Sequence, residues 1–309
     1  MKKVQIGTRK TLLQKISRDR AWLIMLIIPF LYYVVYRYIP MYGVIIAFKK
    51  FSIARGVMRS DWVGLKWFLQ FFRSYYFSRL VRNTFLISLY SLLFGFPVPI
   101  IFALMLNEVR QLGYKRMVQT ISYLPHFISV VIVVGMMVSF LSPAGGLVNV
   151  VIERLGGETK SFMSDLRWFR ALYVGSGIWQ QFGFGSIIYL AAIAGINVEL
   201  YDAAEADGCT RLQKIRHITI PGIASTIMIL LILRMGRMLS VGFEKVLLMY
   251  SEATYEVADV ISTYVYRRGI IGGEYSFATA VGLFNSVVNL VFLTVFNWLA
   301  RKYSETSLW

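Results

Sequence analysis

A short run of aromatic and amide side chains interrupts a long apolar stretch in the middle of the chain. Trp179, Gln180 and Gln181 stand there, followed closely by the small residues Gly183 and Gly185. Aromatic faces suit the apolar faces of sugar rings, and amides exchange hydrogen bonds with sugar hydroxyls. Polar groups inside apolar segments usually face a wet cavity or a bundle interior, so we expect these residues to line a solute pathway, with Trp179 stacked on a sugar. The alternative is that Trp179 belongs to an aromatic belt at a membrane surface.

Two further pairs of polar residues lie in later apolar stretches. Arg234 and Arg237 are three residues apart and Asn285 and Asn289 are four apart, so each pair shares a helix face. At about 1.5 Å of rise per residue, the arginines fall near the outer end of their stretch. There they either snorkel to lipid headgroups or contact an anionic solute or a docked protein. The asparagines either join helices by hydrogen bonds or contact solute.

A charged loop between two apolar runs, residues 199–221, has the pattern of two short helices joined at a glycine. Its first part is rich in alanine and acidic residues, which favour a helix whose first turn is acidic. Asp207 and Gly208 supply a stop, because glycine accepts the left-handed conformation of a helix end. Thr210 and Gln213 have the spacing of a capping box, which predicts the start of a second helix.

Such a loop can be held in a groove on another protein. Its small alanines permit close approach and its charges offer complementarity to a partner. The alternative is a simple elbow between two membrane spans. The candidate coupling residues are Asp202, Ala203, Ala204, Glu205, Asp207, Gly208, Arg211 and Pro221.

The sequence offers little that could support catalysis or metal binding. His126 and His217 stand far apart, and Cys209 is the one cysteine, so the chain can form neither an internal disulfide nor a cysteine-based zinc cluster. The G-x-x-x-x-G-K-[ST] motif of a phosphate-binding loop is also missing. We expect no enzyme activity, no metal site and no cofactor bound by this chain.

The candidate residues lie on or between stretches that can cross a membrane. Of 309 residues, 57% are hydrophobic and 16% charged, and the mean hydropathy of +0.60 is too apolar for a soluble domain. Each stretch supplies most or all of the roughly 20 residues that a spanning helix needs. We therefore predict an all-α membrane protein with six transmembrane helices, at residues 21–36 (continuing to 48), 83–107, 117–140, 171–198, 218–233 and 276–300.

Residues 1–20 form a basic segment ahead of the first apolar stretch. That stretch is too long for a signal peptide and no cleavage site follows, so we expect a cytoplasmic amino-terminal segment and one permease-sized membrane domain over 21–309. Lys and Arg outside the spans divide equally between the two sides, so orientation rests on the basic leader. An even number of spans then places the carboxyl terminus in the cytoplasm. The apolar stretches make membrane lipid an expected partner, and the even distribution of the +17 charge argues against a nucleic-acid footprint, which would cluster on one face.

Two segments outside the spans carry mixed apolar and charged residues. Residues 51–77 are predicted to form a half-apolar helix along the outer interface or, equally well, a packed loop with a partial helix. Residues 249–275 are predicted to form a short helix and a loop near the mouth of the pathway.

The charged loop resembles the "EAA" loop of ATP-binding-cassette (ABC) importer permeases, which reads E-A-A, three residues, Gly, nine residues, I-x-L-P. The pattern is matched without insertion, although aspartate replaces the glutamate and isoleucine the leucine. The loop also lies two spans from the carboxyl end, as in that family. The matching residues are Asp202, Ala203, Ala204, Gly208, Ile218, Ile220 and Pro221.

Other segments resemble the polysaccharide-type subgroup of binding-protein-dependent carbohydrate permeases, and the similarity covers nearly the whole chain. The resemblance implies a type I importer subunit with cytoplasmic coupling helices, in the cell membrane of a bacterium. It further implies a second, different permease chain, two cytoplasmic ATPase subunits that bind ATP and Mg, and an extracytoplasmic solute-binding protein. The segments are residues 39–43, 264–269, 275–280 and 307–309.

Together these features predict the permease subunit of an ATP-driven importer of oligosaccharide or polysaccharide, working by alternating access. One alternative is an importer permease of the same class for another solute, such as a peptide or amino acid. Another is a secondary carrier, which would need acidic residues in the membrane for ion coupling. None of the six apolar stretches contains Asp or Glu.

Overall fold

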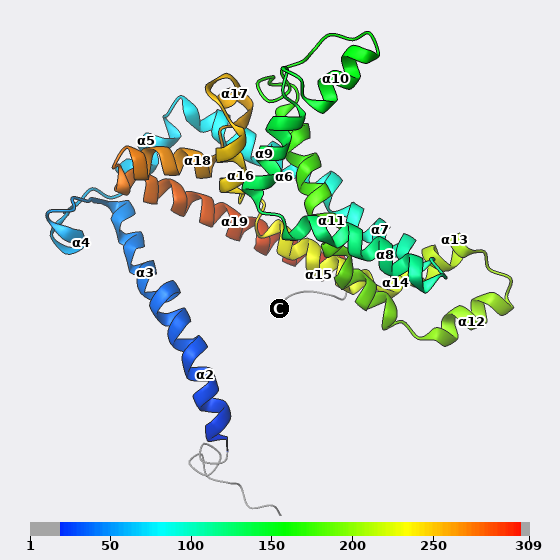
Figure 1. The fold of residues 1–309 in the computed structure, drawn as a ribbon. Coiled ribbons are helices and arrows are strands. Elements are labelled where there is room, and N and C mark those ends of the chain that lie inside the picture. Colours follow the sequence, from blue (N-terminus) through cyan, green and yellow to red (C-terminus); the bar gives the residue numbers. More distant parts are fainter. Residues whose placement is uncertain (1–18, 304–309) are drawn as a thin grey trace, which may run out of the picture.

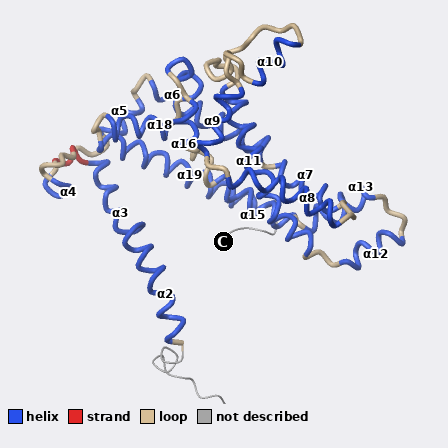
Figure 2. Tube along the Cα trace, viewed as in Figure 1, coloured by secondary structure: helices blue, strands red, loops and turns tan. Residues whose placement is uncertain are grey.

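The computed structural model describes residues 19–303, and this part of the chain is almost entirely helical (Figure 1). Its one sheet is a pair of two-residue antiparallel strands, β1 (Lys49–Lys50) and β2 (Asp61–Trp62). Figure 2 shows these strands beside the first long helix, with helices and short loops elsewhere. The all-α prediction is confirmed. Most of the basic leader and the terminal Ser307-Leu308-Trp309 lie outside the described residues.

Four helical segments are each long and apolar enough to cross a membrane: Arg20–Phe48, Tyr76–Asn107, Phe169–Ala194 and Tyr275–Lys302. Two further pairs of helices pass the same test together but bend at a short break. Leu112–Phe127 meets Val130–Phe140 at 97°, and Arg211–Gly222 meets Ala224–Met235 at 59°. The six predicted spans are therefore present when each bent pair counts as one, and two of them are broken rather than straight.

The first span stands apart from the rest of the chain. Its residues change helix type along the way, from α2 (Arg20–Tyr33) through a π turn (Val34–Tyr38) and α3 (Ile39–Met41) to a 3₁₀ helix (Tyr42–Phe48). Figure 1 shows α2 extending away from the other helices, and none of its residues is buried.

The remaining spans form a bundle around α11 (Phe169–Ala194), which has 26 residues. It packs along both halves of the second span, α6 (Tyr76–Gly95) and α7 (Pro97–Asn107). The last span, α19 (Tyr275–Tyr303), packs against α15 (Ala224–Met235). Three buried apolar clusters join these helices, with members that include Ile87, Phe169, Phe71, Leu80, Ile193 and Ile223.

The segment over residues 51–77 is a loop with partial helices, as one of the two predicted alternatives has it, and its position at a membrane interface stays a prediction. Only α4 (Gly56–Arg59) and α5 (Lys66–Phe72) are helical before α6 begins at Tyr76. The aromatic side chains of this segment divide between the protein interior and the surface, where Trp62 and Phe72 are exposed. Trp62 stacks on Phe48 with ring centroids 5.7 Å apart, and Phe71 is 1% exposed.

Short helices cover the same end of the molecule. The predicted short helix and loop over 249–275 consists of two helices, α17 (Tyr255–Ala258) and α18 (Ile261–Tyr266), followed by a π turn (Arg267–Ile271). Two helices outside the spans were not predicted, α10 (Leu147–Arg154) and α16 (Phe243–Met249).

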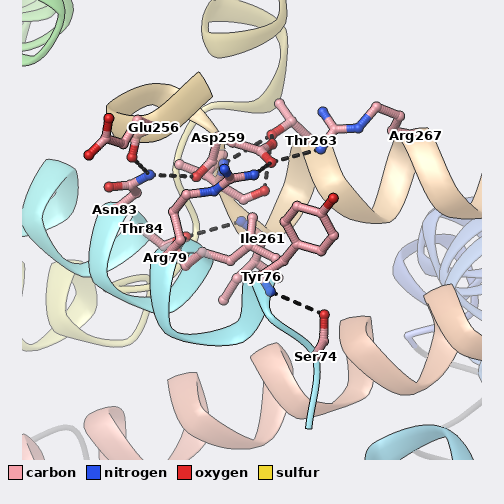
Figure 3. Close-up of polar contacts among 12 residues, drawn as sticks. Ser74, Tyr76, Arg79, Asn83, Thr84, Glu256, Asp259, Ile261, Thr263 and Arg267 are labelled. Carbon is pink, nitrogen blue, oxygen red and sulfur yellow. Dashed lines mark hydrogen bonds and ion pairs between the residues drawn. The ribbon is translucent and has the colours of Figure 1, made fainter. Parts of the chain in front are cut away.

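A buried carboxylate ties these short helices to the second span. Asp259 is completely buried and forms ion pairs with Arg267 at 2.7 Å and with Arg79 of α6 at 3.4 Å. Thr263 donates a further hydrogen bond to it at 2.9 Å. Figure 3 shows these side chains gathered around Asp259. Asn83, one turn along α6 from Arg79, donates to the Asp259 backbone oxygen at 3.0 Å.

Removing this carboxylate should weaken the outer end of the fold. Asp259→Ala leaves Arg79 and Arg267 without their shared counter-charge. This loss should lower the free energy of unfolding by about 3–5 kcal/mol. The control is Asp61→Ala, whose pair with Arg55 is 61% and 64% exposed and should matter by less than about 1 kcal/mol. Thermal unfolding of the purified protein at one scan rate should show a large drop in midpoint for the first variant alone. Equal midpoints for the two variants would contradict the assignment.

Candidate functional site

The charged loop begins with the helix that its alanines predicted, α12 (Val198–Ala206). Its start is capped by Asn197, whose side-chain oxygen accepts a hydrogen bond from the Glu199 N–H at 3.0 Å. The sequence analysis did not single out Asn197, although asparagine is among the preferred residues for this position. Glu199 lies in the first turn, where its charge complements the helix dipole.

The predicted stop at Gly208 is confirmed. This glycine has φ of +71°, in the left-handed region. Around it the Cys209 N–H donates to the Ala204 oxygen at 2.8 Å, and the Gly208 N–H to the Glu205 oxygen at 3.1 Å. These are the two hydrogen bonds of a Schellman motif, so the turn satisfies the last carbonyls of α12.

The second short helix, α13 (Arg211–Lys214), begins at the predicted capping box. The Thr210 hydroxyl accepts from the Gln213 N–H at 3.4 Å, and the Thr210 N–H donates to Gln213 Oε1 at 2.7 Å. An ion pair of 2.8 Å joins Lys214 to Glu205 of α12. The hydrogen bond and the charge of Lys214 lower the pKa of the Glu205 carboxyl, which keeps it ionised at neutral pH. The two helices are thus held together across the turn.

The loop presents a small-residue, charged surface to its surroundings. Figure 1 shows α12 and α13 projecting at the end of the molecule opposite α17 and α18. Of the eight predicted coupling residues all except the half-buried Ala204 are exposed. One hydrogen bond anchors the loop to the bent fifth span: the Tyr201 hydroxyl lies 2.9 Å from that of Thr219. Seven of the eight residues are therefore accessible to another protein, and their role in coupling stays a prediction.

A cavity of about 1040 Å³ lies on the bundle between the two ends. Residues of the second span, of α11, of α15 and of the segment leading into α16 form its wall. Four of the predicted pathway residues are on this wall: Gln180, Gln181, Arg234 and Arg237. Trp179, Asn285 and Asn289 are not among its lining residues.

The amino-acid sequence matches that of a known protein family. The family described as binding-protein-dependent transport system inner membrane component matches residues 95–305. The chain belongs to this family.

Similar proteins extend the match to nearly the whole permease. It is 47% identical to Protein LplB of Bacillus subtilis (strain 168), over 95% of the chain and 92% of that protein. It is 42% identical to the polygalacturonan/rhamnogalacturonan transport system permease protein YteP of the same organism, over 97% of the chain and 94% of that protein. A chain in the crystal structure of a bacterial ABC transporter involved in the import of the acidic polysaccharide alginate is 46% identical, with a TM-score of 0.88, covering 95% of this chain and 99% of that one.

The permease is therefore a non-catalytic, membrane-embedded transport component. Its described residues contain no group of three or more His, Cys, Asp or Glu side chains that could hold a metal ion.

The two glutamines on the cavity wall also hold the broken third span. Gln180 donates to the backbone oxygen of Ile128, within the break, at 2.7 Å. Gln181 Oε1 lies 3.0 Å from Nδ1 of His126, whose ring stacks on Phe184 at 3.8 Å. His126 is thus a packed residue. Gln181 remains exposed to the cavity, whereas Gln180 is buried.

The asparagines of the last span lie elsewhere. Asn289 accepts from the Leu239 N–H at 2.8 Å and donates to the Ser240 hydroxyl at 3.1 Å, so it joins α19 to the chain after α15, as the interhelical alternative proposed. The side-chain oxygen of Asn285 is buried with no hydrogen-bond partner among the described residues. Trp179 is 41% exposed, and its contact with a sugar stays a prediction.

Arg234, near the end of α15, and Arg237, two residues beyond it, both line the cavity, and their contact with lipid headgroups, a solute or a docked protein stays a prediction. Arg234 donates to the Ser91 backbone oxygen at 2.8 Å. The sequence analysis missed two charged neighbours on the same wall, Glu244 and Lys245. The sequence carries no local signal for them, because they lie beyond the fifth apolar stretch and their place on the wall depends on packing against α11, where Lys245 meets Tyr173.

Glycines set how closely α11 approaches its neighbours. A β-carbon on Gly183 would lie 2.0 Å from the backbone oxygen of Ser122 in α8 (Leu112–Tyr123), a contact that no side-chain motion can relieve. A β-carbon on Gly185, two residues later, would meet Pro99 at 3.5 Å, an ordinary van der Waals distance. The close approach at Gly183 places Gln180 and Gln181 against the break in the third span.

Alanine at these two glycines should therefore have opposite effects. Gly183→Ala should destabilise the permease by about 1–3 kcal/mol or more through overpacking. Gly185→Ala should be neutral or slightly stabilising, because alanine is the better helix former. Thermal unfolding of the two purified variants measures the difference. A Gly183→Ala variant as stable as wild type would refute the close contact with α8.

Proposed function

We propose that the permease is the transmembrane subunit of an ATP-driven importer of oligosaccharide or polysaccharide. The observation that carries the proposal is the likeness, over nearly the whole chain, to a permease of a polygalacturonan/rhamnogalacturonan transport system and to a chain of an ABC transporter involved in alginate import. The cavity supports it, because exposed amide and guanidinium groups on its wall can exchange hydrogen bonds with sugar hydroxyls. The pathway residues in this proposal are Gln180, Gln181, Arg234 and Arg237, with Trp179, Asn285 and Asn289 placed outside the cavity of the single chain.

The ATP is hydrolysed by partner subunits in this proposal. The permease sequence has no phosphate-binding loop, whereas α12 and α13 form an exposed, internally braced element of the kind that a groove on another protein can grip. We assign two cytoplasmic ATPase subunits, with their ATP and Mg, to the end of the molecule that carries this loop. Both termini of the permease then lie in the cytoplasm of a bacterium, with the membrane between them and the solute source.

A second permease chain completes the pathway. The helix α2 is apolar and has no buried residue, so lipid and a neighbouring subunit must cover it in the membrane. An extracytoplasmic solute-binding protein delivers the sugar to the opposite end, near α17 and α18. The alginate transporter, whose matching chain is 45% identical with a TM-score of 0.89, has been solved in complex with its pentasaccharide-bound periplasmic protein.

The fifth span offers a mechanical route from the loop to the cavity. The Tyr201–Thr219 hydrogen bond holds α12 to the lower half of this span, below its 59° bend. The upper half, α15, ends at Met235, so Arg234 and Arg237 lie at its far end. We infer that movement of the coupling loop, driven by closure of the ATPases, displaces the cavity wall and alternates access between the two sides.

Two alternatives to this function differ from it in solute or in energy source. An importer permease for a peptide or amino acid would use the same loop with another solute. A secondary carrier would need no ATPase. Membrane vesicles that contain the assembled complex separate these cases: uptake of labelled oligosaccharide with ATP supports the proposal, and uptake driven by an ion gradient alone would refute it.

Backbone strain at Gly208 should uncouple transport. A β-branched residue at φ of +71° costs about 1–2 kcal/mol and opens the turn that joins α12 to α13. We expect Gly208→Val to insert and assemble but to lose most uptake per ATP hydrolysed in vesicles.

The matched control is Gly64→Val, which has the same kind of strain (φ of +59°) in the outer sheet region. Neither glycine has atoms within 4 Å of an added β-carbon, so backbone conformation alone is tested in both. Uptake by Gly208→Val equal to that of Gly64→Val would exclude the coupling role.

A further inference from the structure

The wall of the cavity carries more positive than negative charge. Its charged lining residues are three basic side chains and one acidic side chain: Arg234, Arg237, Lys245 and Glu244. The cavity lies between helices of a membrane protein, where unbalanced charges are costly unless they serve a function. The excess of positive charge therefore calls for an anion that enters the cavity.

Arg237 is the cation most available to such an anion. Among residues 19–303 its side chain has no hydrogen bond and no ion pair, and it is exposed on the cavity wall. A guanidinium group presents a planar set of donors that matches a carboxylate with two parallel hydrogen bonds. Arg234, one turn earlier, uses one of its nitrogens on the Ser91 oxygen and keeps other donors free.

Lys245 is held as a cation without an acidic partner. Its side chain is 8% exposed, donates to the Tyr173 backbone oxygen at 2.8 Å and lies 4.8 Å from the centre of the Tyr173 ring. Burial lowers the pKa of this amine to about 8, so it is still mostly protonated at pH 7. An anion beside it would offset the cost of burying the charge.

Glycines make room for two of these cations. A β-carbon on Gly177 would lie 3.3 Å from Nζ of Lys245, and one on Gly95 would lie 3.3 Å from Nη2 of Arg234. Both glycines line the cavity. Each cation thus rests against the backbone of a facing helix, in a position that any larger residue would disturb.

We propose that this cavity selects acidic oligosaccharides, whose uronate carboxylates bind Arg237 and Lys245 during passage while Gln181 contacts hydroxyl groups. The inference rests on the proposed function and names the substrate class of the same pathway. A polyuronate carries a carboxylate on every sugar, so one carboxylate can engage a cation as the preceding one leaves. Several binding sites of moderate affinity, arranged one after another along the pathway, permit entry without trapping the solute.

The test uses the assembled complex in proteoliposomes with its solute-binding protein and ATP. The probes are tetragalacturonate, an alginate tetramer, and the tetragalacturonate backbone with its carboxyls reduced to alcohols. Binding of each probe to the solute-binding protein is measured separately by calorimetry, which separates delivery from passage. We expect uptake of at least one acidic tetramer and little uptake of the reduced one.

Arg237→Gln should lower uptake of the acidic tetramer about tenfold at limiting concentration, through a higher KM, because a charge-assisted contact is lost. Arg237→Lys should restore much of it. The control Arg154→Gln removes an exposed positive charge on α10, away from the cavity, and should behave as wild type. ATP hydrolysis of the empty complex should be the same in all four proteins.

Three outcomes would overturn the inference. Unchanged uptake of the acidic tetramers by Arg237→Gln, or ATP-driven uptake of neutral oligosaccharides alone, would refute acidic selection and leave the proposed function intact. Absence of ATP-driven uptake for every oligosaccharide, acidic or neutral, would refute the proposed function and the inference with it.

Discussion

The structure depends on one constraint, that backbone polar groups inside a membrane must find hydrogen bonds within the protein. Long helices meet this demand by themselves, but two of the six spans are broken. At these breaks, and after the end of the fifth span, polar side chains form hydrogen bonds with the backbone groups that no helix satisfies. Gln180 donates to the Ile128 oxygen beside the bend of the third span, and Asn289 accepts from the Leu239 N–H just beyond the fifth. The hydroxyl of Tyr173 accepts from the Gly242 N–H at 3.1 Å. Several polar residues that lie in the spans therefore stabilise the fold before they contact any solute.

The position of the cavity follows from these interruptions of the helices. A broken span leaves helix ends, short connections and polar side chains close together, and such a place can hold water and solute. The segment from Met235 to Lys245 leaves the helical path beside α11, and the cavity forms along it. The same breaks allow the two halves of a span to change their relative angle, which a single straight helix cannot do without bending. In the proposed function, solute contact and movement thus depend on the same interruptions of regular structure.

The sequence predicted those features that depend on neighbours along the chain. The stop at Gly208 and the capping box of Thr210 and Gln213 need only local geometry, and both form as expected. Features that depend on distant residues were missed or left open. Nothing near Asp259 in the sequence indicates its pairing with Arg79, 180 residues earlier. The pattern over residues 51–77 left an interfacial helix and a packed loop equally open, because it could not reveal contacts such as the stacking of Trp62 on Phe48. The orientation of Arg234 and Arg237 likewise depends on packing against α6, which spacing within one helix does not determine.

Charged side chains are paired to different degrees at the two ends of the molecule and in the cavity between them. This difference in pairing bears on transport. At the end of the molecule that carries α17 and α18, the buried Asp259 pairs with two arginines and joins α6 to the short helices. At the coupling loop Lys214 and Glu205 pair at the surface, where water weakens the interaction and leaves the neighbouring charges open to a partner. In the cavity three basic side chains face one acidic side chain, and there Arg237 has no partner among the described residues. One end is held by Asp259 and the other by the Lys214–Glu205 pair. The cavity between them is then the part whose electrostatics would change when a charged solute enters. In the proposed mechanism, the binding energy of an anion is therefore available at the wall that the coupling loop displaces.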